Sequence, residues 1–166
     1  EVWPIAGEFT TGEMFHSTQN YQFLFNAITF ANGGPARQLV RSLELLRRAY
    51  PEAYQPLLMN HTSTHDRPRA LAELGWETYD APGYEEARSR LLLLEALKYA
   101  WIGAPTIFYG DEIGVTGGGD PRNRGPYPWE DTGADWGDAG LIDEYRALGA
   151  VRQEYGHIFE IGRAHV

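Results

Sequence analysis

Three short segments of this chain place acidic or imidazole side chains close to apolar residues. The segments are Glu1-Val2-Trp3 at the start, Ser63-Thr64-His65-Asp66 in the middle, and residues 103–114 later in the chain. In a barrel of parallel strands, the residues at the carboxyl ends of the strands build the catalytic face. Two carboxylates delivered in this way, with aromatic and arginine residues nearby, suit the cleavage of a glycosidic bond.

The hydrophobic periodicity between these segments alternates between strand-like and helical stretches. It predicts helices at 23–31, 36–49, 84–102 and 141–155, and short strands within 14–21, at 56–59 and at 106–109. Strands that alternate with helices and are followed by long polar loops favour parallel βα units. We therefore expect an α/β chain, the C-terminal half of a (β/α)₈ TIM barrel that is truncated at both ends.

Composition and charge exclude several classes of protein. A hydrophobic fraction of 43% excludes a disordered chain. The net charge of −9, with no cluster of basic residues, makes nucleic acid and anionic membrane surfaces poor partners. The apolar stretch at 91–94 is too short to span a bilayer. The absence of cysteine excludes disulfides and leaves the compartment open, with the cytoplasm slightly favoured.

The two ends of the chain carry their own expectations. The first residues include no initiator methionine and no signal-like segment. We therefore expect the N-terminus of the parent protein, with any targeting signal, to be missing from this sequence. Residues 161–166 match what one reading frame of a common sequencing-adapter oligonucleotide encodes. We therefore expect residues 1–160 to form one partial catalytic barrel and residues 161–166 to be a non-native tail.

His65 and Asp66 are candidate site residues because they follow the apolar run at 57–59 after a polar link at 60–64. A carboxylate at Asp66 can stabilise positive charge on a sugar ring, and His65 can hydrogen-bond the sugar hydroxyls. The alternative is a helix cap, since Asp66 precedes Arg67-Pro68 and Asp before Pro often starts a helix. Taken alone, the dipeptide favours the cap.

Glu1 and Trp3 form the second candidate pair. Glu1 can act as general acid and base if apolar neighbours raise its proton affinity, and Trp3 can pack against a sugar face. The alternative is an exposed terminal glutamate beside a tryptophan of the core.

A loop rich in glycine and proline, residues 117–129, contains the third candidate pair. Asp120 and Arg124 can form a charged pair that clamps vicinal hydroxyls, or they can form a salt bridge in a solvated loop. The phosphate-binding Lys-Ser/Thr and the dinucleotide fingerprint are both absent from the sequence. Asp111 and Glu112 are expected to be structural and to pair with arginines inside the barrel.

The histidines and the remaining carboxylates show no metal-ligand spacing. His16, His61 and His157 are scattered, and we expect them at the surface or in loops. The acidic stretch at 129–138 lacks calcium-binding spacing and reads as a solvated face. We expect no metal site and no organic cofactor, with calcium left open for the intact parent.

In their order and spacing, these motifs resemble the α-amylase family of retaining glycoside hydrolases, within it the neopullulanase, cyclomaltodextrinase and maltogenic-amylase group. Glu1-Val2-Trp3 resembles the segment that carries the general acid/base, and Asn20-Tyr21 resembles a sixth-strand stretch. Residues 63–66 are similar to the seventh-strand motif, in which Asp stabilises the transition state and His contacts the sugar. Residues 103–114 resemble the eighth-strand motif, and residues 120–124 resemble the loop whose Asp and Arg bind a sugar.

This resemblance implies a chain that runs from the end of strand five through helix eight. The parent would be a retaining hydrolase of α-1,4-glucosidic bonds in maltodextrin, cyclodextrin or pullulan, with α-glucan oligosaccharides as partners and a homodimer left open. The nucleophilic Asp and its neighbouring Arg would lie upstream, so this piece alone would be inactive. Three positions depart from the family pattern: Arg67, His61 and Gly125.

Two other functions are compatible with the same barrel. One is a glucosyltransferase or trehalose-forming relative, which differs in the acceptor. The other is a non-catalytic, amylase-like interaction domain, against which the presence of Glu1, His65 and Asp66 speaks.

Overall fold

The computed structural model describes residues 6–129 and 137–161. Glu1 and Trp3, the greater part of the acidic stretch, and residues 162–166 of the expected tail lie outside these ranges. The helices and strands are α1 (Tyr21–Ala31), α2 (Ala36–Ala49), β1 (Met59–Asn60), α3 (Ala70–Glu73), α4 (Tyr84–Ala100), β2 (Ala104–Pro105) and α5 (Ala139–Ile161).

Parallel pairing organises the chain. Met59 of β1 lies opposite Ala104 of β2, and Gln19 forms a parallel bridge with Met59 on the other side. The connection from Gln19 to β1 contains α1 and α2, and the connection from β1 to β2 contains α3 and α4. Parallel strands joined through helices are the βα units that the sequence predicts.

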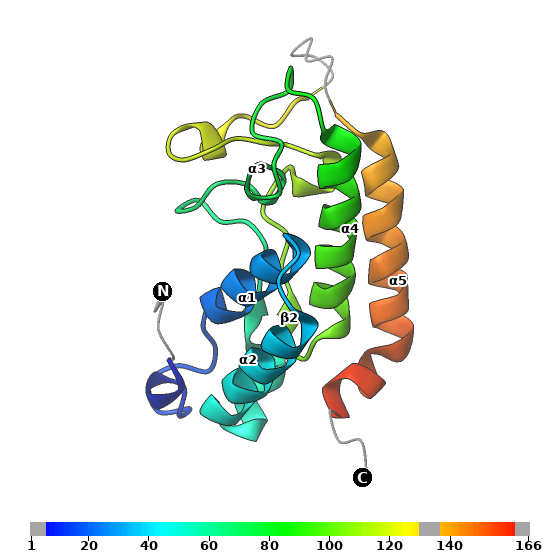
Figure 1. The fold of residues 1–166 in the computed structure, drawn as a ribbon. Helices are drawn as coiled ribbons and strands as arrows, with labels where there is room; N and C mark the ends of the chain where they lie inside the picture. Colours follow the sequence, from blue (N-terminus) through cyan, green and yellow to red (C-terminus); the bar gives the residue numbers. More distant parts are fainter. Residues whose placement is uncertain (1–5, 130–136, 162–166) are drawn as a thin grey trace.

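The helices pack in two pairs beside these strands. α1 packs against α2, and α4 packs against α5, and Figure 1 shows α4 and α5 running side by side. α1 also contacts α4, which joins the two pairs. No helix in the described ranges has the length and apolar character that a membrane span requires.

The predicted helices are confirmed, with shifts at their ends. The prediction for α2 matches the observed bounds, whereas α1 begins earlier, at Tyr21, and α4 ends earlier, at Ala100. α5 continues past the predicted end to Ile161, so the first residue of the expected tail is still helical. The short helix α3 was not predicted.

Two predicted strands, at 56–59 and 106–109, are displaced by a few residues, whereas the prediction within 14–21 contains the bridging residue Gln19. Residues Glu52–Leu57 form a 3₁₀ turn that contains Pro56, and the strand starts only at Met59. The ladder bonds run from Ala104 N to Leu58 O (2.8 Å) and from Thr106 N to Asn60 O (2.7 Å). The apolar run at 56–59 overlaps β1 only at Met59, and the run at 106–109 begins just after β2 ends, because pairing between segments rather than local composition places the ladder.

The amphipathic helix α2 buries one stripe against α1. Leu39, Leu43 and Leu46 are buried, whereas Val40 is 55% exposed. Each residue turns an α-helix by about 100°, so Val40 points away from the row that Leu39 and Leu43 share.

Two amide contacts connect the parallel segments, and a third caps α1. Asn20 caps α1 by accepting from Phe23 N (3.1 Å), and its Nδ2 donates to Asn60 Oδ1 (2.8 Å). Asn60 Nδ2 in turn donates to Ile102 O (2.9 Å). The row ties the segment at residue 20 to β1 and to the start of β2.

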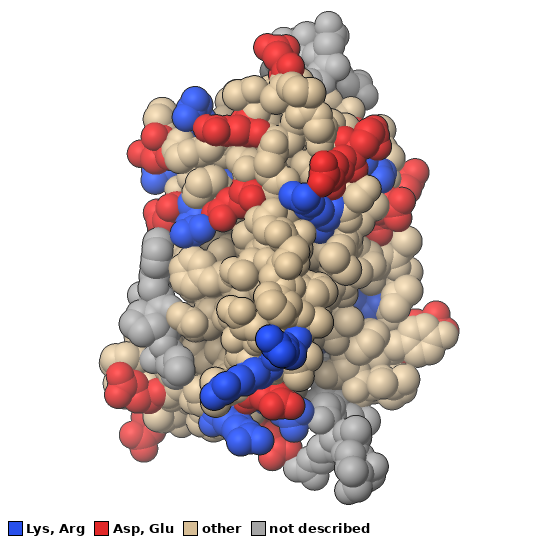
Figure 2. Space-filling model, in the orientation of Figure 1, with Lys and Arg blue, Asp and Glu red and all other residues tan. Residues whose placement is uncertain are grey.

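Charged side chains are mixed rather than sorted by sign on the face seen in Figure 2. Lys and Arg lie beside Asp and Glu at both ends of this face, and the centre of the face is uncharged. The net charge of −9 is therefore not gathered into one acidic patch on this face.

Candidate functional site

The loops that follow β1 and β2 bring four predicted site residues together. Arg124 Nε lies 3.2 Å from Asp120 Oδ1, and Arg124 Nη2 lies 4.0 Å from Asp66 Oδ1. Arg124 Nε also donates to His65 O (3.0 Å), and His65 Nε2 lies 3.4 Å from Asp66 Oδ1. Residues more than fifty positions apart in the sequence thus form one polar cluster of two carboxylates, an imidazole and a guanidinium.

Solvent reaches every member of this cluster. The side chains of His65 and Asp66 are 52% and 32% exposed, and those of Arg124 and Asp120 are also open. Carboxylate and guanidinium groups that face solvent can accept from and donate to the hydroxyls of a sugar. The predicted charged pair of Asp120 and Arg124 is confirmed as a pair.

Asp66 does not serve as a helix cap, so that alternative is wrong. α3 begins at Ala70, and Ala70 N donates to Ser63 Oγ (2.9 Å) instead. The backbone N–H of Asp66 donates to Thr64 Oγ1 (3.2 Å). The carboxylate of Asp66 is therefore left to face Arg124 and solvent.

The buried side chain of Arg69 connects the loops that carry the site. Arg69 has no solvent exposure, and its Nε donates to Asn123 O (2.8 Å) while its Nη1 donates to Tyr109 O. Nη1 also pairs with Asp111 Oδ1 at 3.2 Å, which confirms the structural role predicted for Asp111. Burial raises the pKa of Asp111 to about 7, although the charge of Arg69 acts in the opposite direction.

Aromatic rings cover the same guanidinium. Arg69 Cζ lies 4.2 Å from the ring centroid of Phe108 and 4.5 Å from that of Tyr109. A guanidinium on ring faces gains cation–π stabilisation, which is larger when the group is out of water. Phe108 and Tyr109, from the predicted eighth-strand segment, therefore help to keep Arg69 in place.

A cavity of about 100 Å³ lies between the ends of the strands, next to His65. Its lining combines polar and apolar side chains: Gln19, Met59, His61, Ser63, Thr64, His65, Thr106, Ile107 and Phe108. The cavity gives the cluster a partly apolar wall, a property common to ligand sites.

His61 lies in the loop after β1, one of the two places expected for it, but it is buried rather than at the surface. Its ring packs edge-to-face on Tyr21 with centroids 4.8 Å apart, and neither ring nitrogen has a hydrogen-bond partner in residues 6–129 and 137–161. Burial, with a contribution from Lys98, lowers the pKa of His61 to about 4. His61 is therefore neutral at neutral pH, whereas His16 and His157 are exposed as predicted.

Glu95 and Lys98 of α4 form a buried ion pair that the sequence analysis missed. Lys98 Nζ lies 2.6 Å from Glu95 Oε2, and both side chains have no solvent exposure. Thr62 Oγ1 donates to Glu95 Oε1 (2.7 Å), and Lys98 Nζ donates to Thr106 O (3.1 Å). The pair is thus hydrogen-bonded to the segments that follow β1 and β2. Two opposite charges three positions apart in an otherwise apolar helix were the sequence pattern that could have predicted it.

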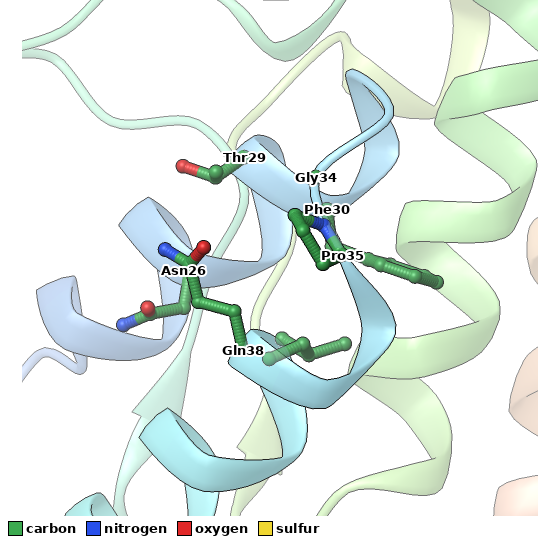
Figure 3. Close-up of a pocket in the computed structure, with 7 residues that line it drawn as sticks. Asn26, Thr29, Phe30, Gly34, Pro35 and Gln38 are labelled. Atoms are coloured by element: carbon green, nitrogen blue, oxygen red, sulfur yellow. The ribbon is translucent and has the colours of Figure 1, made fainter.

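Two other hollows lie apart from the cluster. The one shown in Figure 3, where the turn before α2 meets α1, has a volume of about 10 Å³, room for about one water molecule. A wider one of about 270 Å³ is lined by aromatic rings, including Trp76 and Tyr84. Its polar groups are engaged, since Tyr84 Oη donates to Asp138 Oδ2 (2.6 Å) and Trp76 Nε1 donates to Ala81 O (2.9 Å).

The part of the chain that the structure describes contains no group of three His, Cys, Asp or Glu side chains placed to hold a metal ion. Asp138, from the acidic stretch, instead pairs with Arg88 Nε at 2.6 Å.

Known proteins of similar sequence are larger than this chain. It is 34% identical over 150 residues to neopullulanase 2 of Thermoactinomyces vulgaris, a match covering 89% of the chain and 23% of the relative. It is 30% identical over 156 residues to the maltogenic α-amylase of Bacillus acidopullulyticus, covering 93% of the chain and 24% of the relative. The chain thus spans about a quarter of the length of these relatives. No protein-family model matches it.

Solved structures resemble the chain over nearly its whole length. The cyclic α-maltosyl-(1→6)-maltose hydrolase of Arthrobacter globiformis superposes with a TM-score of 0.82 at 28% identity, covering 98% of this chain and 34% of that one. The type III pullulan hydrolase of Thermococcus kodakarensis also gives a TM-score of 0.82, at 29% identity, covering 93% of this chain and 27% of that one. The fold is that of part of a TIM barrel.

Proposed function

Because this chain belongs to the α-amylase family of glycoside hydrolases, we propose that it is the C-terminal half of a catalytic (β/α)₈ barrel. In this proposal the chain runs from the end of strand five, at Glu1, through helix eight, formed by α5. The segment at Gln19, then β1, then β2 would be strands six to eight. Residues 1–160 would belong to the barrel, and residues 161–166 would be a non-native tail.

The proposed activity of the parent is the retaining hydrolysis of α-1,4-glucosidic bonds in maltodextrin, cyclodextrin or pullulan. The observation that carries it is the meeting of Asp66, His65, Asp120 and Arg124 at the carboxyl ends of parallel strands. Names among the relatives, such as neopullulanase and cyclomaltodextrinase, support this substrate class.

The reaction would proceed in two displacements. A carboxylate from the upstream half would attack the anomeric carbon while Glu1 protonates the leaving oxygen, and Glu1 would then take a proton from the water that releases the sugar. Asp66 would stabilise the positive charge that develops on the ring, because a fixed carboxylate is most effective where charge appears in the transition state. His65, Trp3, Asp120 and Arg124 would orient the sugar.

The test is the Asp66→Asn variant of the parent polypeptide. Turnover of a maltodextrin should fall by about 10²-fold or more, while binding of maltooligosaccharide is retained. Asp143→Asn, at an exposed carboxylate of α5 that pairs with Arg146, is the matched control and should keep full turnover. Turnover near the wild-type level in D66N would remove the assignment of Asp66, and a parent without an upstream nucleophile would point to a binding domain.

A further inference from the structure

Asn123 holds the peptide backbone on both sides of Asp66. Its Nδ2 donates to His65 O at 2.8 Å and to Arg67 O at 2.9 Å, the carbonyls of the two residues that flank Asp66. Asn123 itself has no solvent exposure. One buried amide group therefore uses both of its N–H donors on the backbone that carries the proposed transition-state carboxylate.

Asn123 is in turn fixed by groups that belong to the interior. Arg69 Nε donates to Asn123 O at 2.8 Å, and Arg69 is held by Asp111 at 3.2 Å with both side chains out of solvent. Asn123 also lies in the 3₁₀ turn Arg122–Arg124, next to the guanidinium that contacts Asp66. Asn123 is thus held by the buried Arg69–Asp111 pair and itself holds the backbone at Asp66.

The side chain of Asp66 has weak contacts of its own. Its carboxylate lies 3.4 Å from His65 Nε2 and 4.0 Å from Arg124 Nη2, and it is 32% exposed. Contacts of this length across partly exposed groups restrain a side chain little. The place of the carboxylate therefore depends on where the backbone of residues 65–67 lies.

From these contacts we propose that Asn123 is a positioning residue for glycosidic cleavage, acting through the backbone on either side of Asp66. The proposal rests on the function proposed above for Asp66. A shift of about 1 Å in a catalytic group can cost about 10²-fold in rate, so the two hydrogen bonds should affect the chemical step more than sugar binding.

The experiment compares Asn123→Asp in the parent polypeptide with the wild type. The substitution keeps the shape of the side chain but replaces the NH₂ group by a carboxyl oxygen, which donates to neither carbonyl when ionised and to at most one of them when protonated. On a maltodextrin, kcat should fall by about 10²-fold, with a smaller change in KM. Asn123→Ser has a single short donor, which cannot reach both carbonyls, and it should lower kcat by less than N123D does. It takes the place of N123D in the comparison if N123D does not fold.

Gln55 offers a matched control at the opposite end of β1. Its buried Nε2 also donates to two backbone carbonyls, those of Arg47 (2.7 Å) and Tyr50 (2.9 Å). Gln55→Glu should lower the unfolding temperature as N123D does, but it should leave kcat unchanged.

The possible results test the positioning role of Asn123 and the proposed function separately. If folded N123D or N123S keeps the wild-type kcat while D66N is inactive, Asn123 is structural only and the positioning role is wrong. If N123D lowers kcat and Q55E does not, the role is supported. If the wild-type parent cleaves no α-glucan, or if D66N retains turnover, the proposed function fails instead, whatever Asn123 does.

Discussion

Arg69 and Asp111 form an ion pair with almost no contact with solvent. Nη1 lies 3.2 Å from Oδ1, and the two side chains are 0% and 2% exposed. Arg69 follows β1 and Asp111 follows β2, so the pair joins the two loops that carry the site. The partners are unequal, because Arg69 also donates to the carbonyls of Tyr109 and Asn123.

This inequality predicts different costs for removing each partner. Arg69→Met withdraws the donors from two carbonyls and leaves a buried carboxyl group, so the free energy of unfolding should fall by about 3–5 kcal/mol. Asp111→Asn keeps an oxygen that can accept from Arg69 Nη1, and Arg69 keeps its hydrogen bonds to the carbonyls of Tyr109 and Asn123, so this variant should lose less, about 1–3 kcal/mol. Urea unfolding of both variants measures the difference, and equal losses would contradict the unequal roles.

Local patterns predicted most of the helices because their information lies within one segment. The apolar stripe of α2 repeats at helical spacing, and its bounds could be predicted from the sequence. β1 and β2 are each two residues long, and their positions depend on hydrogen bonds with a partner far away in the sequence. No periodicity exists within two residues, so these strands were misplaced.

The same distinction applies to the site. Asp66, His65, Asp120 and Arg124 were predicted because carboxylate, imidazole and guanidinium groups after apolar runs have recognisable chemistry. Asn123 was missed because an amide in a loop rich in glycine and proline is also typical of a turn. The roles of Arg69 and the burial of His61 follow from contacts across the fold, which composition and spacing do not carry.

Burial of His61 predicts a specific dependence of stability on pH. Its pKa is lowered to about 4 in the folded state, against an ordinary value of 6.5. As pH falls from about 6.5 to about 4, His61 takes up a proton in the unfolded chain but not in the folded chain. The free energy of unfolding therefore falls by about 3 kcal/mol over this range. Above pH 7 the imidazole of His61 is neutral in both states. His61→Phe should therefore gain stability relative to wild type by that amount between pH 7 and pH 4.

Unfolding at several pH values gives the difference between the two proteins, in which the groups common to both cancel. His61→Leu is the control, because it lacks both the titrating group and the ring contact with Tyr21. It should be less stable than H61F at every pH and should show the same pH dependence relative to wild type. A constant difference between wild type and H61F across this range would show that His61 does not titrate in this way.

Gly103, just before β2, is predicted to tolerate no side chain. Its φ is +124°, and a Cβ would lie 2.7 Å from Leu58 O and 2.5 Å from Asn60 Nδ2. Gly103→Ala should therefore lower the free energy of unfolding by about 2 kcal/mol or more. Gly149→Ala is the contrasting variant, since Gly149 lies within α5 with nothing within 4 Å, and it should gain about 0.5–1 kcal/mol. A neutral G103A would mean that β1 and β2 can separate at low cost.

Arg124 is predicted to affect sugar binding more than turnover, if the parent has the proposed activity. Its Nε contacts both Asp120 (3.2 Å) and His65 O (3.0 Å), and lysine has no donor at that position. Arg124→Lys keeps the charge but loses the Nε donor, so KM for a maltodextrin should rise by about 10-fold with a smaller change in kcat. Arg122→Lys is the control in the same turn, because Arg122 pairs with Glu77 at the surface, and it should leave both constants unchanged. An unchanged KM in R124K would place the sugar away from the Asp120–Arg124 pair, and a loss confined to kcat would instead assign Arg124 to the placement of Asp66.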